Sequence, residues 1–151
     1  MKLQKQPNNW SCLPTAFASL LEIDVKHIIR ATGHDGSTLM WRSFDPPYCY
    51  RGWHIQELVQ LALEFGYAVT TIERVLYSAP NDIVEPYVQF DNVLFEYTLN
   101  NKAGIVACKT VDDNSHALIF ERGNYYDTRT GKQAYRDYFK FNDILWRVDK
   151  L

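Results

Sequence analysis

The N-terminal segment joins a polar loop to a strongly apolar stretch, and a cysteine stands at the junction. Residues 4–21 read QKQPNNWSCLPTAFASLL. Apolar residues at helical spacing predict a buried helix over residues 12–22, with Ser11 as its N-cap and Pro14 tolerated in its first turn. The thiol of Cys12 then lies beside unpaired backbone N–H groups at the positive end of the helix dipole, which favour the nucleophilic thiolate. We expect this helix to be the central element of the fold.

The same criteria predict two more helices in the first half of the chain. Asp24 is a candidate N-cap for a short helix over Val25 to Ala31, and Gly33 is its stop. An apolar stripe at helical spacing predicts a longer helix over residues 54–65. These two helices and the Cys12 helix together predict a helical N-terminal half.

The rest of the chain changes character. Residues 34–52 show no sustained periodicity and are expected to form a long ordered loop, and residues 91–99 are predicted to be helical, with a strand as the alternative. Five segments have the apolar, β-branched or aromatic content of strands: residues 67–72, 104–109, 116–121, 123–127 and 144–149. Helices followed by strands separated by turns predict an α+β fold, with N-terminal helices packed on a C-terminal antiparallel sheet.

Length and charge narrow the functional classes. A chain of 151 residues is expected to form a single domain. Its 16 basic and 18 acidic side chains nearly balance, which argues against a nucleic-acid partner. No apolar run approaches the length of a membrane span, and the first ten residues lack the apolar segment of a secretory signal. We therefore expect a cytoplasmic protein that binds neither nucleic acid nor membrane.

The cysteines favour reduced thiols over a disulfide framework or a metal site. Cys12, Cys49 and Cys108 are an odd number of widely spaced residues. A zinc site built from Cys49, His34 and His54 matches no common ligand spacing. Neither a metal nor another cofactor is expected, and Cys108, in an apolar strand, is interpreted as a core residue.

Four polar residues have the order of a thiol-hydrolase site. A cysteine nucleophile needs a base, a group that orients the base, and donors for the oxyanion. His116 opens a predicted strand and can be the base of Cys12, while Asp127, on the next strand of a hairpin, can fix its tautomer. Gln6 can present a side-chain N–H to the oxyanion beside the backbone N–H of Cys12.

With these residues the chain resembles the papain-like cysteine peptidases of the C39 type, which include bacteriocin-processing domains that cleave leader peptides after a Gly-Gly pair. The resemblance rests on Gln6-x5-Cys12-x-Pro14 before a core helix, then His116 at the start of one strand and Asp127 at the end of the next. It implies a papain-like fold, Gln6 as oxyanion donor, and Cys12, His116 and Asp127 as nucleophile, base and orienting group. The implied substrate is a protein or peptide.

Two motif positions differ from the family pattern. The family usually has Asp-Cys-Gly where this chain has Ser11-Cys12-Leu13, and Asp-Pro where it has Asp127-Thr128. Leu13 replaces a small residue next to the nucleophile and is expected to alter or narrow the cleft. The chain shows no transporter portion, so the resemblance points to a stand-alone bacterial or phage member.

Aromatic side chains near predicted loops are candidates for a cleft wall that holds an extended peptide. Tyr and Trp are favoured at recognition surfaces, although packing on a small core is the other interpretation. We take as candidate substrate-binding residues the following set: Trp10, Ser11, Trp41, Tyr48, Trp53 and Ser115.

Three other interpretations remain open. The same triad supports acyl transfer, as in transglutaminase-like proteins. A papain-like fold can also keep its cleft and act only as a binding module that sequesters a protein partner, an alternative that Leu13 and the aromatic residues 41–53 favour. Finally, Cys12 can be an inert buried residue, and Asp127 a turn aspartate that bonds its own backbone.

Overall fold

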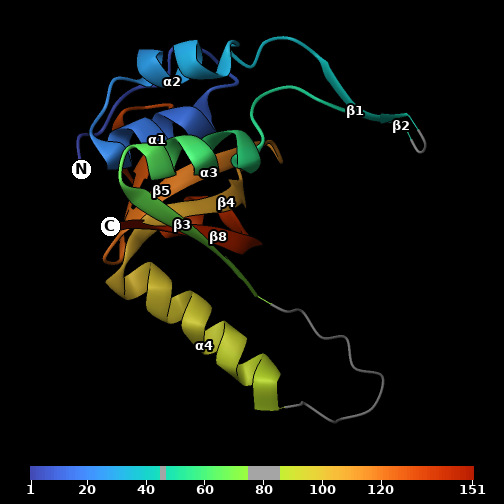
Figure 1. Ribbon diagram of the computed structural model, residues 1–151. Coiled ribbons are helices and arrows are strands. Elements are labelled where there is room, and N and C mark those ends of the chain that lie inside the picture. Colours follow the sequence, from blue (N-terminus) through green and yellow to red (C-terminus); the bar gives the residue numbers. More distant parts are fainter. Residues whose placement is uncertain (45–46, 75–85) are drawn as a thin grey trace.

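An antiparallel sheet with helices on both faces forms the body of the protein (Figure 1). The computed structural model describes residues 1–44, 47–74 and 86–151, and describes side chains outside residues 40–50 and 75–91. Within these ranges the sheet has six strands in the order β3-β8-β4-β5-β6-β7, and every neighbouring pair is antiparallel. The predicted α+β class is confirmed.

The strands follow the sequence prediction closely. Their bounds are β3 (Tyr67–Glu73), β4 (Ala103–Lys109), β5 (Ser115–Glu121), β6 (Asn124–Asp127), β7 (Lys132–Ala134) and β8 (Lys140–Lys150). The short β7 was not predicted, and β8 begins four residues earlier than expected, after a 3-10 turn at Arg136–Tyr138. Residues 116–120 of β5 are buried without interruption, because this strand is covered on both faces.

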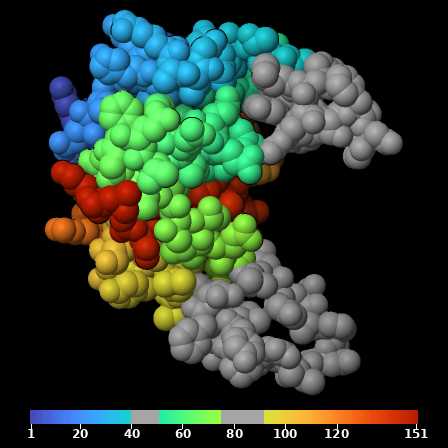
Figure 2. Space-filling view, in the orientation of Figure 1, coloured from blue at the N-terminus to red at the C-terminus, as the bar shows by residue number. Residues whose placement is uncertain are grey.

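Three helices cover one face of the sheet. They are α1 (Cys12–Leu21), α2 (Val25–Thr32) and α3 (Ile55–Glu64). Every residue of α1 after Cys12 is buried, which confirms its predicted central position. In the space-filling view, α2 (blue) and α3 (green) lie against each other on the outer surface, above the red C-terminal strand (Figure 2).

The predicted N-cap of α2 is confirmed, and the predicted N-cap of α1 is wrong. The Asp24 side chain accepts a hydrogen bond from the Lys26 backbone N–H, and Gly33 ends α2 with a φ of 77°, both as predicted. Ser11 precedes α1, but its side chain makes no capping hydrogen bond. Its hydroxyl donates instead to the carbonyl of Asn8 at 3.3 Å, because Ser11 has a ψ of 25° and not the extended backbone that typical N-caps have.

The opposite face of the sheet is covered by α4 (Pro86–Asn101), which is longer than the helix predicted over residues 91–99. Phe95 and Leu99 are fully buried against Val106, Leu118 and Phe120 of the sheet. The fold therefore has two apolar cores, one on each face of the sheet.

The expectation of an ordered loop over residues 34–52 is wrong in part. Strands β1 (Met40–Phe44) and β2 (Pro47–Tyr50) form a separate antiparallel hairpin that projects from the helical layer (Figure 1). The sequence of this segment shows no sustained hydrophobic periodicity, although its aromatic content is typical of strands. Among the described helices, none is both long enough and apolar enough to cross a membrane.

Candidate active site

The predicted catalytic residues come from three parts of the fold. Cys12 is the first residue of α1, His116 is the second residue of β5, and Asp127 is the last residue of β6. Gln6 lies in the extended segment before α1. Because α1 packs directly against β5 and the strands β5 and β6 are neighbours, the three elements meet at one edge of the helical layer.

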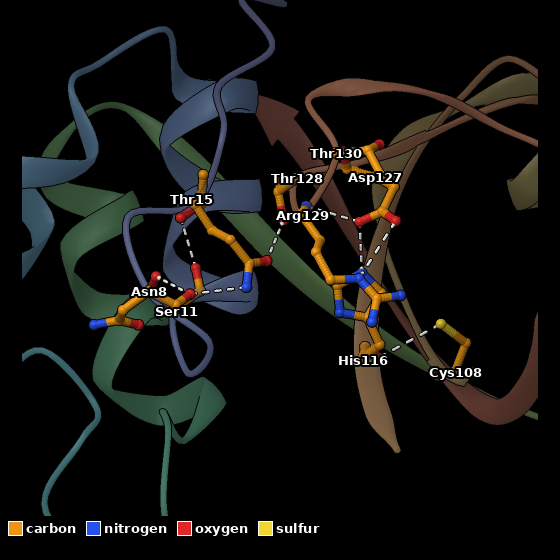
Figure 3. A network of polar contacts seen from close by, with 10 residues as sticks. Asn8, Ser11, Thr15, Cys108, His116, Asp127, Thr128, Arg129 and Thr130 are labelled. Carbon is orange, nitrogen blue, oxygen red and sulfur yellow. Dashed lines mark hydrogen bonds and ion pairs between the residues drawn. The ribbon is translucent and has the colours of Figure 1, made fainter. Parts of the chain in front are cut away.

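His116 and Asp127 form a buried pair. The Nε2 atom of His116 lies 2.7 Å from Oδ1 of Asp127, and the two side chains are only 5% and 6% exposed. The backbone N–H of Arg129 donates to the same Oδ1 atom at 2.8 Å (Figure 3). Asp127 is thus both the partner of His116 and a turn aspartate that bonds its own backbone, so the two interpretations are compatible.

His116 and Asp127 each stabilise the charged form of the other. Burial by itself lowers the pKa of His116, but the hydrogen bond that the ring donates to Asp127 and the nearby Cys12 outweigh it and raise the pKa to about 9. Burial opposes ionisation of Asp127 as well, yet the hydrogen bonds from His116 and from the Arg129 backbone lower the pKa of this carboxyl. At neutral pH the pair is therefore an imidazolium and a carboxylate.

Cys12 is placed to use the second ring nitrogen of His116. After Asp127, it is the side chain that raises the pKa of His116, and the two residues line one cleft. Since Nε2 is bonded to Asp127, Nδ1 is the nitrogen that remains for a proton exchange with the thiol. Cys12 is partly exposed, as a nucleophile must be, whereas Cys108 is fully buried and its pKa is raised to about 12 by burial.

Gln6 is held by the residue that follows Asp127. The backbone N–H of Gln6 donates to the carbonyl of Thr128 at 2.8 Å, and the Thr128 hydroxyl donates to Oε1 of Gln6 at 3.2 Å. The Nε2 group of Gln6 donates one hydrogen to the carbonyl of Asn8 at 2.8 Å. In Figure 3, Thr128 lies between the α1 side of the network and Asp127. A second Nε2 hydrogen stays available for an oxyanion.

Two cavities meet at His116. We call the first the apolar cleft: it has a volume of about 290 Å³, and its walls include Trp10, Cys12, Leu13, Trp53, His116 and Trp146. The second, the polar pocket, has a volume of about 450 Å³ and is lined by Gln6, Asn9, Thr110, Asn114, Ser115, His116 and Arg129. Leu13 is buried and forms part of the first wall, so the residue that departs from the family pattern borders the cleft without closing it.

The structure distributes the candidate substrate-binding residues differently from the prediction. Trp10, Trp53 and Ser115 line the apolar cleft, and Ser115 also lines the polar pocket. Ser11 is a correction: its side chain is fully buried and lines neither cavity, because its hydroxyl bonds to Asn8 inside the fold. Trp41 and Tyr48 belong to β1 and β2, and their side chains lie outside the described residues.

Trp53 is positioned by a group of residues that the sequence did not reveal. The His34 ring stacks on Trp53 with 4.0 Å between ring centroids. Nε2 of His34 lies 2.5 Å from Oε1 of Glu57, and Nδ1 accepts a hydrogen bond from the Gly36 backbone at 3.1 Å. A Cβ at Gly36 would come within 2.7 Å of the Trp53 indole nitrogen, so only glycine fits this approach.

His34 and His54, the two histidines of the zinc site that the sequence argues against, have other contacts. His34 holds Trp53, and the His54 side chain caps α3 by accepting a hydrogen bond from the Gln56 backbone at 3.3 Å. Among the described residues, no three His, Cys, Asp or Glu side chains are grouped so that they could hold a metal ion. The side chain of Cys49, the third residue of the zinc site that the sequence argues against, lies outside those residues.

Sequence reasoning missed Thr128, Asn8 and Arg129. The sequence contained one signal for Thr128 and Arg129, the turn Thr128–Gly131 after Asp127, but a turn pattern does not tell which distant segment its polar groups contact. The chain matches no protein-family model, and no curated protein matches it.

Proposed function

We propose that this protein is a papain-like cysteine peptidase of the C39 type, in which Cys12 cleaves peptide or isopeptide bonds with the help of His116, Asp127 and Gln6. The observation that carries the proposal is the buried His116–Asp127 pair, 2.7 Å apart, next to a partly exposed cysteine at the start of a buried helix. A helix that carries the cysteine and an antiparallel sheet that carries the histidine and aspartate support the papain-like assignment.

The first half of the reaction forms a thioester. The Cys12 thiolate attacks the carbonyl carbon, and the carbonyl oxygen becomes an oxyanion that accepts hydrogen bonds from the Cys12 backbone N–H and the second Nε2 hydrogen of Gln6. The C–N bond then breaks, and the leaving amine takes the proton held at Nδ1 of His116. Asp127 keeps the ring in this orientation through Nε2.

The second half regenerates the enzyme. Neutral His116 accepts a proton from a water molecule, which attacks the thioester carbonyl, and the carboxylic acid product leaves. The Cys12 thiolate returns with an imidazolium beside it, which is the state favoured by the raised pKa of His116, about 9. Each proton given to the leaving amine is thus replaced by one from water.

Cleavage of a proteome-derived peptide mixture, read by mass spectrometry, tests the proposal. We expect new termini with the wild-type protein and none with Cys12→Ala, while both proteins unfold at about the same temperature. As a control, iodoacetamide should alkylate the thiol of Cys12 and abolish cleavage. Cleavage that persists in the Cys12→Ala protein would overturn the proposal.

Hydrolysis and acyl transfer are distinguished in the same experiment. Adding a primary amine such as glycinamide should leave the hydrolytic product dominant, since water deacylates the thioester. A product that carries glycinamide in place of the new carboxylate, formed at millimolar amine, would assign the site to acyl transfer instead.

A further inference from the structure

The two cavities border the reacting groups unequally. The apolar cleft is lined by both Cys12 and His116, whereas the polar pocket is lined by His116 and Gln6 but not by Cys12. The acyl part of a substrate stays bonded to the Cys12 sulfur after the first half-reaction, and the leaving amine must be beside His116 when it takes its proton. The apolar cleft therefore suits the acyl part, and the polar pocket suits the leaving part.

Arg129 sets the charge of the polar pocket. Of the described residues that line it, His116 and Arg129 are the ones that carry charge. The Nε atom of Arg129 lies 3.9 Å from Oδ2 of Asp127, beyond hydrogen-bonding distance, and the side chain is 48% exposed. The Asp127 carboxylate already has closer partners in His116 and the Arg129 backbone N–H, so the guanidinium keeps donors for another carboxylate.

Asp127, 3.9 Å from Nε of Arg129, offsets part of this charge, but the acidic residues of the neighbouring turn do not line the pocket. Asp112 and Asp113 lie on the turn between β4 and β5, close to Thr110 and Asn114 in the chain, but neither lines the pocket. Asp113 is paired with Lys109 at 2.9 Å. The other lining groups are hydroxyls and amides, which can donate hydrogen bonds to an anion as well.

We propose that the polar pocket is a subsite for a leaving fragment that carries a carboxylate on its first residue, and that Arg129 selects this carboxylate. The inference rests on the proposed function, because the leaving side is defined by the reaction. The carboxylate can come from an Asp or Glu side chain or from the C-terminus of a one-residue fragment. Both sources offer the planar oxygen pair that a guanidinium binds.

Cleavage by the wild-type protein and two Arg129 variants tests the selection. Three probes are peptides with a common acyl part and Glu, Gln or Lys as the first leaving residue. Two further probes end at the first leaving residue, one with a free and one with an amidated C-terminal carboxyl group. We expect kcat/KM for Glu to exceed that for Lys by about five- to tenfold in the wild type. Arg129→Gln should remove the preference, and Arg129→Glu should invert it.

The controls separate a local contact from a general charge effect. Lys132 is an exposed cation on β7. Its backbone lies opposite Asp127 in the register of β6 and β7, but it does not line the pocket. Lys132→Gln should therefore keep the preference for Glu. A preference that is equal in the wild type and Arg129→Gln, or a wild type that treats Glu and Lys alike, overturns the subsite. Faster cleavage of the free-carboxyl probe than of the amidated one identifies the C-terminal source.

A binding measurement keeps the subsite testable without cleavage. In the Cys12→Ala protein, glutamyl-alaninamide should shift the Arg129 Nε–Hε resonance at concentrations where glutaminyl-alaninamide does not. Equal shifts overturn the subsite. If no peptide is cleaved but the selective shift is seen, the peptidase proposal fails while the carboxylate subsite stands, so the two failures are distinguishable.

Discussion

The side chains of Gln6 and Thr128 are joined by a hydrogen bond of 3.2 Å, although 122 positions separate them in the chain. This bond and the backbone contact beside it tie the segment before Cys12 to the residue after Asp127. The proposed oxyanion donor is therefore oriented by the same strand end that supplies the orienting aspartate. A proline, which the C39 resemblance leads one to expect at this position, has no hydroxyl for this bond.

Thr128→Val should weaken catalysis through Gln6. The substitution keeps the shape of the side chain but removes the donor to Oε1, so the Gln6 amide loses its orientation. We expect kcat to fall about three- to tenfold with little change in KM, and the free energy of unfolding to drop by about 1 kcal/mol. Steady-state kinetics and urea unfolding measure both, and Thr128→Ser, which retains the hydroxyl, should keep the kcat of the wild type.

The stability of the protein should depend on pH through His116. The pKa of His116 is about 9 in the folded protein against an ordinary value of 6.5, so between these values the folded state holds a proton that the unfolded state releases. The pair therefore makes its full contribution to the free energy of unfolding below pH 6.5, and this contribution is lost as the pH rises through 9. We expect this loss to be on the order of 2–3 kcal/mol.

Urea unfolding from pH 5 to 10 measures this dependence. In His116→Gln the decline between pH 6.5 and 9 should disappear, because no titrating group remains at this position. A decline of the same size in wild type and His116→Gln would show that other groups cause it. Asp127→Asn should also flatten the curve, since it removes the first hydrogen bond that raises the pKa of His116.

Cys12 and Cys108 should differ sharply in alkylation by iodoacetamide. Cys12 is partly exposed beside an imidazolium, whereas Cys108 is fully buried and its pKa is raised to about 12. At pH 7 we expect Cys12 to react at least about tenfold faster, as measured by peptide mass spectrometry. His116→Ala should slow Cys12 and leave Cys108 unchanged; an unchanged Cys12 rate would contradict the proposed ion pair.

His34→Ala should loosen the wall of the apolar cleft. It removes the ring that stacks on Trp53 and both hydrogen bonds that hold that ring in place. We expect KM for peptides to rise about threefold or more, and kcat to change less, because Trp53 lines the cleft proposed for the acyl part and has no proposed role in proton transfer. His27→Ala, an exposed histidine on α2, is the matched control and should have no effect.

Gly104→Ala should strongly destabilise the sheet. A Cβ at this position would lie 2.2 Å from the Trp146 carbonyl oxygen and 2.7 Å from the Phe120 ring, and the carbonyl belongs to the neighbouring strand β8. We expect a loss of about 2–4 kcal/mol in the free energy of unfolding. Gly66→Ala should cost only about 1–2 kcal/mol, because no atom lies within 4 Å of its Cβ position and only the positive φ of 80° is strained.

Local features of the fold were predictable because they depend on neighbouring residues. The cap at Asp24, the stop at Gly33 and the apolar spacing of α1 are interactions within one helix, and the sequence displays them directly. The run of buried residues in β5 was recognisable as a strand for the same reason. The candidate site residues Gln6, Cys12, His116 and Asp127 could likewise be selected from their residue types and their order in the chain.

Other features depended on contacts that span the chain. The strands β1 and β2 pair with each other without a hydrophobic periodicity in their sequence, and Ser11 had the residue type of a cap but not its backbone angles. The role of Thr128 arises only when the segment before α1 passes the end of β6.

The sequence by itself determined the helices, most strands of the main sheet and the residue types of the candidate site, since periodicity and capping act over a few residues. Only the tertiary structure decided that His116 Nε2 is bonded to Asp127, that Ser11 is buried away from both cavities, and that Arg129 lines the polar pocket. The physical reason is that these contacts form when the sheet packs on α1, which brings together side chains that local patterns leave independent.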